Sequence, residues 1–206
     1  TAVKCCQISP HISVLGSDDM VKFHDLVGRI GALLSSDHPL TVKDTVNLYR
    51  KVEDDWRREY IERNVLFRYG VNWDSLMESL AGDKLPQSFI DHLFSAVERC
   101  EIPFMTDVIF AGWDPDGTPK IFSVTPESID DRSHYGFAVI GEGNQIANIE
   151  FKSGLYLPSM RKSAVIFKAL VAKKQAEAIA SVGHETWIHT IEPGSGCVQV
   201  DYFLVK

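Results

Sequence analysis

The chain has 206 residues, of which 45% are hydrophobic and 24% charged, and its formal net charge is -7. This length suffices for one domain with a large core or for two small ones, and the composition is typical of a soluble globular protein. The acidic balance, without a basic stripe, argues against nucleic acid as a partner. No apolar run approaches the roughly 18 residues of a membrane span, which argues against a membrane partner.

The four cysteines are Cys5, Cys6, Cys100 and Cys197, and they show no paired metal-ligand spacing. Cys5 and Cys6 are adjacent, so in a strand they point to opposite faces and are poor partners for each other. The first residues also lack the basic and long apolar regions of a signal peptide. We therefore predict free thiols in a reducing compartment, hence a cytoplasmic protein, with no metal and no cofactor.

The first part of the chain is predicted to form two short strands and two helices. Residues 3–15 alternate apolar residues with turn formers, which indicates the strand pair. Asp18 or Asp19 can cap the first helix, and Thr41 with Asp44 forms an imperfect capping box for the second. The first helix has an apolar stripe at helical spacing, formed by Met20, Phe23, Val27, Ile30 and Leu34.

The second predicted helix has one apolar side and one charged side. Its apolar residues recur at helical spacing and are Val42, Val46, Tyr49, Val52, Trp56 and Tyr60. The charged residues are Arg50, Lys51, Glu53, Asp54, Asp55, Arg57, Arg58 and Glu59. We interpret this charge run as a solvated face. Two shorter helical patterns follow, near residues 73–80 and 86–99.

A central β-hairpin is predicted between Asp107 and Pro126, where two apolar runs flank a cluster of turn-forming residues at 114–117. The first run is apolar on successive residues, so this strand is expected to be buried on both faces. Downstream patterns predict a strand at 135–140, a helix near 146–155, a long helix over 158–181, and a hairpin of strands 186–191 and 197–205. This order suggests sheets inside and helices outside.

Three stretches together resemble the proteasome-type N-terminal-nucleophile (Ntn) hydrolases, of the bacterial type. The first runs from Lys4 to Gly16 and is similar to the strand pair that leads into the family's first long helix. Residues 110–124 are similar to the family's central hairpin, and residues 138–143 to its small-residue turn before a helix. The order of elements agrees from Lys4 to the C-terminus, whereas residues 57–100 match poorly.

The resemblance implies an α+β fold, a four-layer αββα sandwich of two antiparallel sheets between helix layers. It implies one domain over residues 1–206, with a helical insertion at about 57–100. It also implies a proteasome-like subunit of threonine-type peptidase ancestry, which needs no cofactor. Such a chain assembles with like or related subunits in a ring-type oligomer and hydrolyses a peptide or protein substrate if its nucleophile is present.

The family's chemistry uses an N-terminal threonine whose hydroxyl attacks the scissile carbonyl, and a nearby lysine that lowers the local pKa. Lys4 falls on the family's catalytic lysine, and the strand hairpin that carries the nucleophile then has no counterpart before it. In a rival register Thr1 is the nucleophile and Asp18 its supporting acid, but the lysine strand is then missing. The two registers name different site residues.

Two other active-site positions of the family differ here. Glu142 stands where the family usually has a serine between two glycines, and the aspartate and serine after the long C-terminal helix have no clear match in residues 178–184. An alternative is therefore a non-catalytic structural or regulatory subunit with the same fold. A different amide hydrolase of this fold class is a third hypothesis.

One further motif resembles a metal site at first glance. His184 and His189 flank a glutamate, as in the helix motif of zinc proteases, but they are five residues apart where that motif has four. The segment also alternates like a strand, so the two rings are expected on opposite faces. We predict no metal site from this pair.

Overall fold

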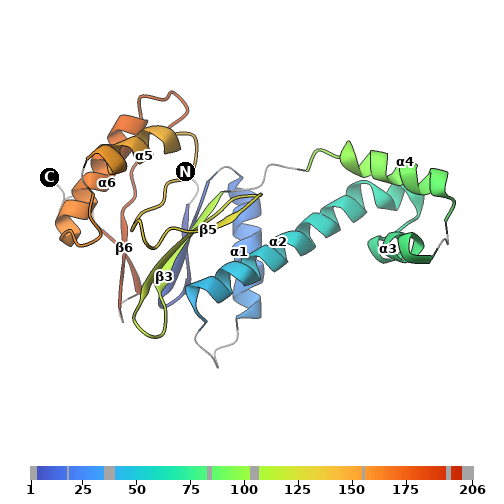
Figure 1. The fold of residues 1–206 in the computed structure, drawn as a ribbon, viewed down its shortest axis with the longest axis horizontal. Coiled ribbons are helices and arrows are strands. Elements are labelled where there is room, and N and C mark those ends of the chain that lie inside the picture. The colour runs from blue at the N-terminus through green and yellow to red at the C-terminus, as the bar shows by residue number, and fades with distance from the viewer. Residues whose placement is uncertain are drawn as a thin grey trace.

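The structure is a computed structural model that describes residues 4–17, 19–34, 40–82, 85–102, 107–154, 156–193 and 196–200. These residues contain six α-helices, a five-stranded antiparallel sheet and a separate two-stranded antiparallel sheet (Figure 1). The mixed helix and sheet class expected from the sequence is therefore confirmed. None of the helices in the described ranges combines the length and apolar character needed to cross a membrane.

The five-stranded sheet follows the chain order, β1-β2-β3-β4-β5, with every neighbour antiparallel. Its strands are β1 (Cys5–Ser9), β2 (Ile12–Gly16), β3 (Val108–Trp113), β4 (Pro119–Val124) and β5 (Ile129–Asp131). The predicted strand pair and central hairpin are confirmed as β1–β2 and β3–β4. The short edge strand β5 was not predicted.

One face of this sheet is apolar and is covered by two helices, α1 (Met20–Leu33) and α2 (Val42–Asn64) (Figure 1). Val14, Phe110 and Phe122 pair across β2, β3 and β4 and form the middle row of that face. The ring of Tyr49 on α2 meets that of Phe110 edge to face, with 5.3 Å between centroids. Alternation along the strands thus places the core between the sheet and the two helices.

Both helices begin at side chains that satisfy their free backbone amides. Asp19 accepts from the second and third amides of α1 at 3.0 Å. Thr41 and Asp44 form a complete capping box on α2, although the sequence predicted an imperfect one. Asp114, in the turn between β3 and β4, also accepts from the Val42 amide at 2.8 Å. The central hairpin therefore holds the start of α2.

The sequence predicted a solvated charged side on α2, but one residue of that side is buried. Glu53 is only 1% exposed. It lies four residues after Tyr49 and therefore on the buried face of the helix, where Arg50 donates to its carboxylate at 2.9 Å. Burial raises the pKa of Glu53, and Arg50 partly opposes that shift. A glutamate is expected at the surface, but the helical period puts Glu53 on the buried face, where the ion pair with Arg50 compensates its charge.

The far half of α2 leaves the sheet and joins a helical lobe (Figure 1). The lobe contains a 3₁₀ turn, η1 (Leu66–Tyr69), and the helices α3 (Trp73–Gly82) and α4 (Gln87–Glu98). It has its own apolar cluster, whose buried members are Ile61, Val65, Leu66, Leu76 and Leu93. The two shorter predicted helices are thus confirmed, within the stretch that matches the proteasome-type pattern poorly.

The opposite side of the sheet carries α5 (Asn144–Ser153), α6 (Lys162–Ala176) and the hairpin β6–β7 (Figure 1). These two strands span His189–Glu192 and Gly196–Gln199. The Trp113 indole donates to the Ile191 carbonyl at 3.1 Å. A Cβ on Gly196 would come within 2.9 Å of the side-chain amide nitrogen of Gln7. The hairpin therefore lies against the sheet face turned away from α1 and α2.

Two predictions for this half were wrong in detail. The predicted strand at 135–140 does not form, because these residues pair with no other strand among those described. Their apolar character serves an aromatic cluster, in which Phe137 stacks on Phe151 at 4.7 Å and the Tyr156 hydroxyl donates to the Gly136 carbonyl at 2.8 Å. The long helix predicted over 158–181 is also shorter, with turns on both sides of α6.

We predict that Gly112→Ala destabilises the fold. A Cβ at this position of β3 would lie 2.2 Å from the His11 carbonyl oxygen, so the backbone of two strands must move. We expect a loss of about 1–3 kcal/mol or more in the free energy of unfolding, measured by urea titration. The control is Gly28→Ala in α1, where a Cβ meets nothing within 4 Å. That change should stabilise by about 0.5–1 kcal/mol, and equal effects would contradict the prediction.

Candidate functional site

Lys4 lies at the start of β1, where three backbone segments meet. The Lys4 carbonyl accepts a hydrogen bond from the Gly16 amide at 2.9 Å. Ser17, which follows Gly16, donates its amide to the Asp107 carbonyl at 3.0 Å. The side chain of Lys4 is exposed and has no hydrogen bond or ion pair with the residues that the structure describes. This end of the sheet therefore presents a free ammonium group to solvent.

The turn at 141–143 reaches the same end of the sheet. Gly141 has a φ of 83°, and a Cβ on it would lie 3.7 Å from the Cβ of Ser17. A Cβ on Gly143 would come within 2.8 Å of Ala176, at the end of α6. The two glycines thus let the turn fit between the end of β2 and the end of α6.

Glu142, between these glycines, contacts the segment that follows α6. Its carboxylate accepts a hydrogen bond from the Ser181 hydroxyl. Sequence reasoning found no counterpart in residues 178–184 for the polar residues that the proteasome-type family has after its long C-terminal helix. The structure nevertheless brings the one serine of that segment to Glu142. Lys4, Glu142 and Ser181 belong to three segments that converge on one end of the fold.

The rival assignment cannot be placed in the same way. Thr1 and Asp18 lie outside the residues that the structure describes. Lys4 immediately precedes β1, and the strand pair that follows it is compatible with either register.

A second cluster, formed by Cys5, His189 and Cys197, lies between the two sheets. These residues come from β1, β6 and β7, and their ligand atoms all lie within 4.8 Å of one another. The Cys197 sulfur is 3.7 Å from His189 Nδ1. Two sulfurs and an imidazole nitrogen are a donor set that suits a soft or borderline metal ion.

Burial raises the pKa of the Cys5 thiol to about 12, and the neighbouring Cys197 adds to the shift. Cys5 without a bound cation is therefore a neutral thiol near pH 7 and a poor nucleophile. The adjacent Cys6 points to the other face of β1, where its sulfur lies 3.6 Å from His24 Nδ1 on α1. The predicted opposite orientation of the two cysteines is thus confirmed.

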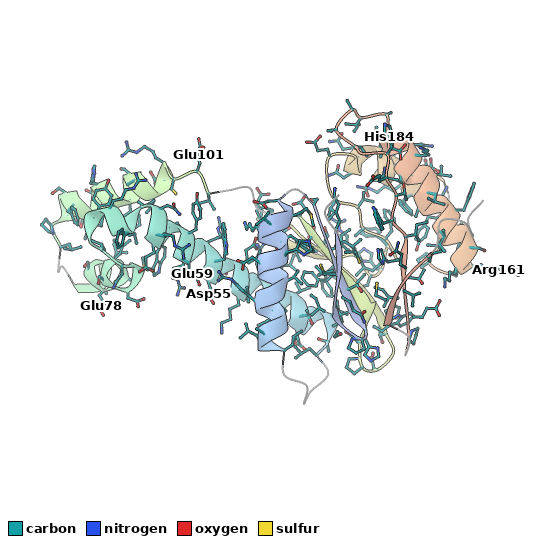
Figure 2. All side chains as sticks on the ribbon, turned by 180° about the vertical axis from the view of Figure 1, so that it is seen from behind. Asp55, Glu59, Glu78, Glu101, Arg161 and His184 are labelled. Carbon is teal, nitrogen blue, oxygen red and sulfur yellow. The ribbon has the colours of Figure 1, made fainter. Side chains whose placement is uncertain are left out.

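His184 is not part of the cysteine cluster and contacts other residues. It lies beyond the end of α6, while Arg161 marks the start of that helix (Figure 2). Its Nδ1 is 3.1 Å from the Glu177 carboxylate, and this carboxylate also accepts from Lys173 and Lys174. These three donors lower the pKa of Glu177 to about 2. His184 and His189 therefore have different partners, and the zinc-protease pattern has no structural basis.

A pocket of about 540 Å³ lies beside α5 and the segment before it. Among the described residues its lining includes two cations, Arg132 and Lys152, and no carboxylate. Arg132 is already paired with Asp130 at 2.9 Å. The pocket contains the Ser123 hydroxyl but no histidine, cysteine or acid to activate it, so it offers a binding surface without catalytic groups.

No protein-family model matches this sequence, and none of the curated proteins matches it. The candidate site is the end of the sheet where the segments of Lys4, Glu142 and Ser181 meet, and the cysteine cluster is a second candidate. Sequence reasoning identified Lys4, gave Glu142 as a departure from the family pattern, and missed Ser181. It also missed the cysteine cluster, although the hairpin predicted over 186–205 contains two of its members, His189 and Cys197.

We predict that Cys5 reacts slowly with iodoacetamide in reduced protein held in EDTA at pH 8. Its raised pKa leaves little thiolate, so alkylation should be at least about tenfold slower than at Cys100. The rate at Cys5 should keep rising up to a pH near 12. Peptide mass spectrometry of quenched samples measures both rates in one digest, and similar rates at pH 8 would show that burial does not control this thiol.

Proposed function

We propose that the chain is a proteasome-like subunit of threonine-type peptidase ancestry, with the four-layer Ntn-hydrolase arrangement, acting in an oligomeric assembly. The observation that carries this proposal is the convergence of Lys4, the turn at 141–143 and the segment after α6. The resemblance assigns these three segments to one active site, although they are far apart in the sequence. Their approach in space therefore supports the assignment independently of their order.

The fold offers further support. A strand pair leads into α1, and α1 and α2 cover one face of the sheet, while the hairpin β6–β7 lies on the other face with α5 and α6 beyond it (Figure 1). This order of layers suits a sandwich of two sheets between helices. In such a subunit peptide hydrolysis requires a nucleophile near the Lys4 ammonium, which would lower the pKa of the attacking group.

The alternative is a structural or regulatory subunit that keeps the fold without the chemistry. The position of Glu142 favours it. A carboxylate that accepts a hydrogen bond from Ser181 stands in the turn where the family usually has a serine. Assembly is common to both proposals, whereas hydrolysis distinguishes them.

Exposed apolar residues mark surfaces for assembly on the two helices that would face other subunits or rings. On α1, Val21 is 84% exposed, and on α6, Phe167 is 66% exposed. Large side chains with this exposure contribute nothing to the core of the isolated chain. They would be buried in a subunit interface, where apolar side chains contribute to the binding energy.

We predict that the chain forms oligomers and that Val21→Lys and Phe167→Lys each weaken assembly at least about tenfold. Mass photometry over a dilution series measures this change. The matched control is Phe67→Lys in the helical lobe, which alters an equally apolar residue that is 80% exposed and should leave assembly unchanged. A wild-type chain that is monomeric at every concentration, alone and with related subunits, would contradict the assembly proposal.

For a chain expressed with its nucleophile, the peptidase proposal predicts a covalent adduct of one peptide epoxyketone per chain, detected by intact mass. Lys4→Ala should lower the rate of adduct formation and of fluorogenic peptide hydrolysis at least about a hundredfold. Lys43→Ala, on the exposed side of α2, is the control and should keep full activity. Loss in Thr1→Ala but not in Lys4→Ala would place the nucleophile in the rival register. No adduct, from an assembled chain, would favour the structural subunit.

A further inference from the structure

The cluster of Cys5, His189 and Cys197 joins two sheets that otherwise have few links. His189 and Cys197 lie on one face of the hairpin, since Cys197 pairs with Ile191, two residues after His189. Cys5 approaches from β1 in the other sheet, on the face away from α1. Three side chains from three strands thus point into the space between the two sheets, where a metal ion could bind all three.

The separations fit a tetrahedral ion. Zn–S bonds of about 2.3 Å and Zn–N bonds of about 2.0 Å place neighbouring ligand atoms roughly 3.5–3.8 Å apart. The Cys197 sulfur and His189 Nδ1 are 3.7 Å apart, and the Cys5 sulfur lies within 4.8 Å of the Cys197 sulfur and of one ring nitrogen of His189. These separations are close to those that a tetrahedral ion requires, and the Cys5 sulfur would have to move nearer by at most about 1 Å.

We propose that Cys5, His189 and Cys197 bind one Zn²⁺ ion, which holds the hairpin β6–β7 against β1. Two thiolates and one imidazole favour zinc over magnesium and calcium, which prefer oxygen ligands. The three protein ligands leave a fourth position for water or an incoming ligand. Binding releases the two thiol protons, because zinc coordinates thiolates. This site is separate from the convergence at Lys4 and does not depend on the proposed peptidase ancestry.

A neighbouring feature shows that this face of the sheet has unmet polar groups. Ser13 is 1% exposed, and its hydroxyl has no hydrogen-bond partner among the described residues. Its neighbour across the ladder is Gln7, which lies on the same face of β1 as Cys5. The space between the sheets therefore contains an unpaired hydroxyl close to the proposed ligands, which a water molecule bound to the ion could reach.

The test uses the full chain, reduced, stripped with a chelator and reconstituted with Zn²⁺ or Co²⁺. We expect about one zinc per chain after gel filtration, measured by elemental mass spectrometry. The Co²⁺ form should show intense visible bands of a tetrahedral site and near-ultraviolet sulfur-to-cobalt charge transfer. Zinc should also raise the melting temperature of the wild-type chain, because the ion binds the folded state.

Cys5→Ser, Cys197→Ser and His189→Gln should each weaken zinc binding at least about a hundredfold, more than a change outside the ligand set. Cys6→Ser and Cys100→Ser keep the ligand set and are the matched controls. Because a ligand variant could fail to fold, Cys197→His provides a second arm. It should still bind Co²⁺, with weaker sulfur-to-cobalt charge transfer, since one sulfur is replaced by nitrogen.

Two results would overturn the site. One is zinc binding that survives in all three ligand variants, which would place the ion elsewhere. The other is a reduced wild-type chain that binds no zinc, whether or not mild oxidation links Cys5 to Cys197. A disulfide detected by peptide mapping in that case would assign the pair to thiol oxidation in place of metal binding.

Discussion

The burial of one face of β2, β3 and β4 beneath α1 and α2 is the interaction on which the rest of the structure depends. Val14, Phe110 and Phe122 form its middle row, and each such side chain contributes about 1.5–3 kcal/mol when buried. A shift of one residue in the register would turn this row to the other face. The contact therefore fixes the register of the sheet and, with it, the position of Lys4 at the start of β1.

The other face of the sheet is held differently. There the row across the strands is Cys5, Leu15, Ile109 and Ser123, which is smaller and more polar than the row beneath the helices. Among the described residues, the hairpin β6–β7 is joined to this face by the indole hydrogen bond from Trp113, by the contact between Cys5 and Cys197, and by the close approach of Gly196 to Gln7 and Pro10. Specific polar links on this face add to its apolar contacts in keeping the second layer in place.

Most of the helices and the central hairpin could be predicted because their signals are local. Asp19 and Thr41 cap helices whose first turns follow directly, and the residues around Asp114 form a turn whatever else surrounds them. The strand predicted at 135–140 failed because a strand needs a partner, and an apolar run can equally serve an aromatic cluster. Cys5 and His189 could not be paired from the sequence, since their approach depends on how two sheets meet.

Two neighbouring groups of residues differ in what they could do chemically. Near the start of β1, the segments that carry Lys4, Glu142 and Ser181 meet, and catalysis would require a nucleophile that none of these residues supplies. Between the two sheets, Cys5, His189 and Cys197 already form a donor set. A fold alone does not specify a reaction, because the same scaffold can carry different chemistry. The described residues therefore place the most complete constellation at the cysteine cluster, where an ion would stabilise the same two-sheet arrangement that a peptidase site at Lys4 requires.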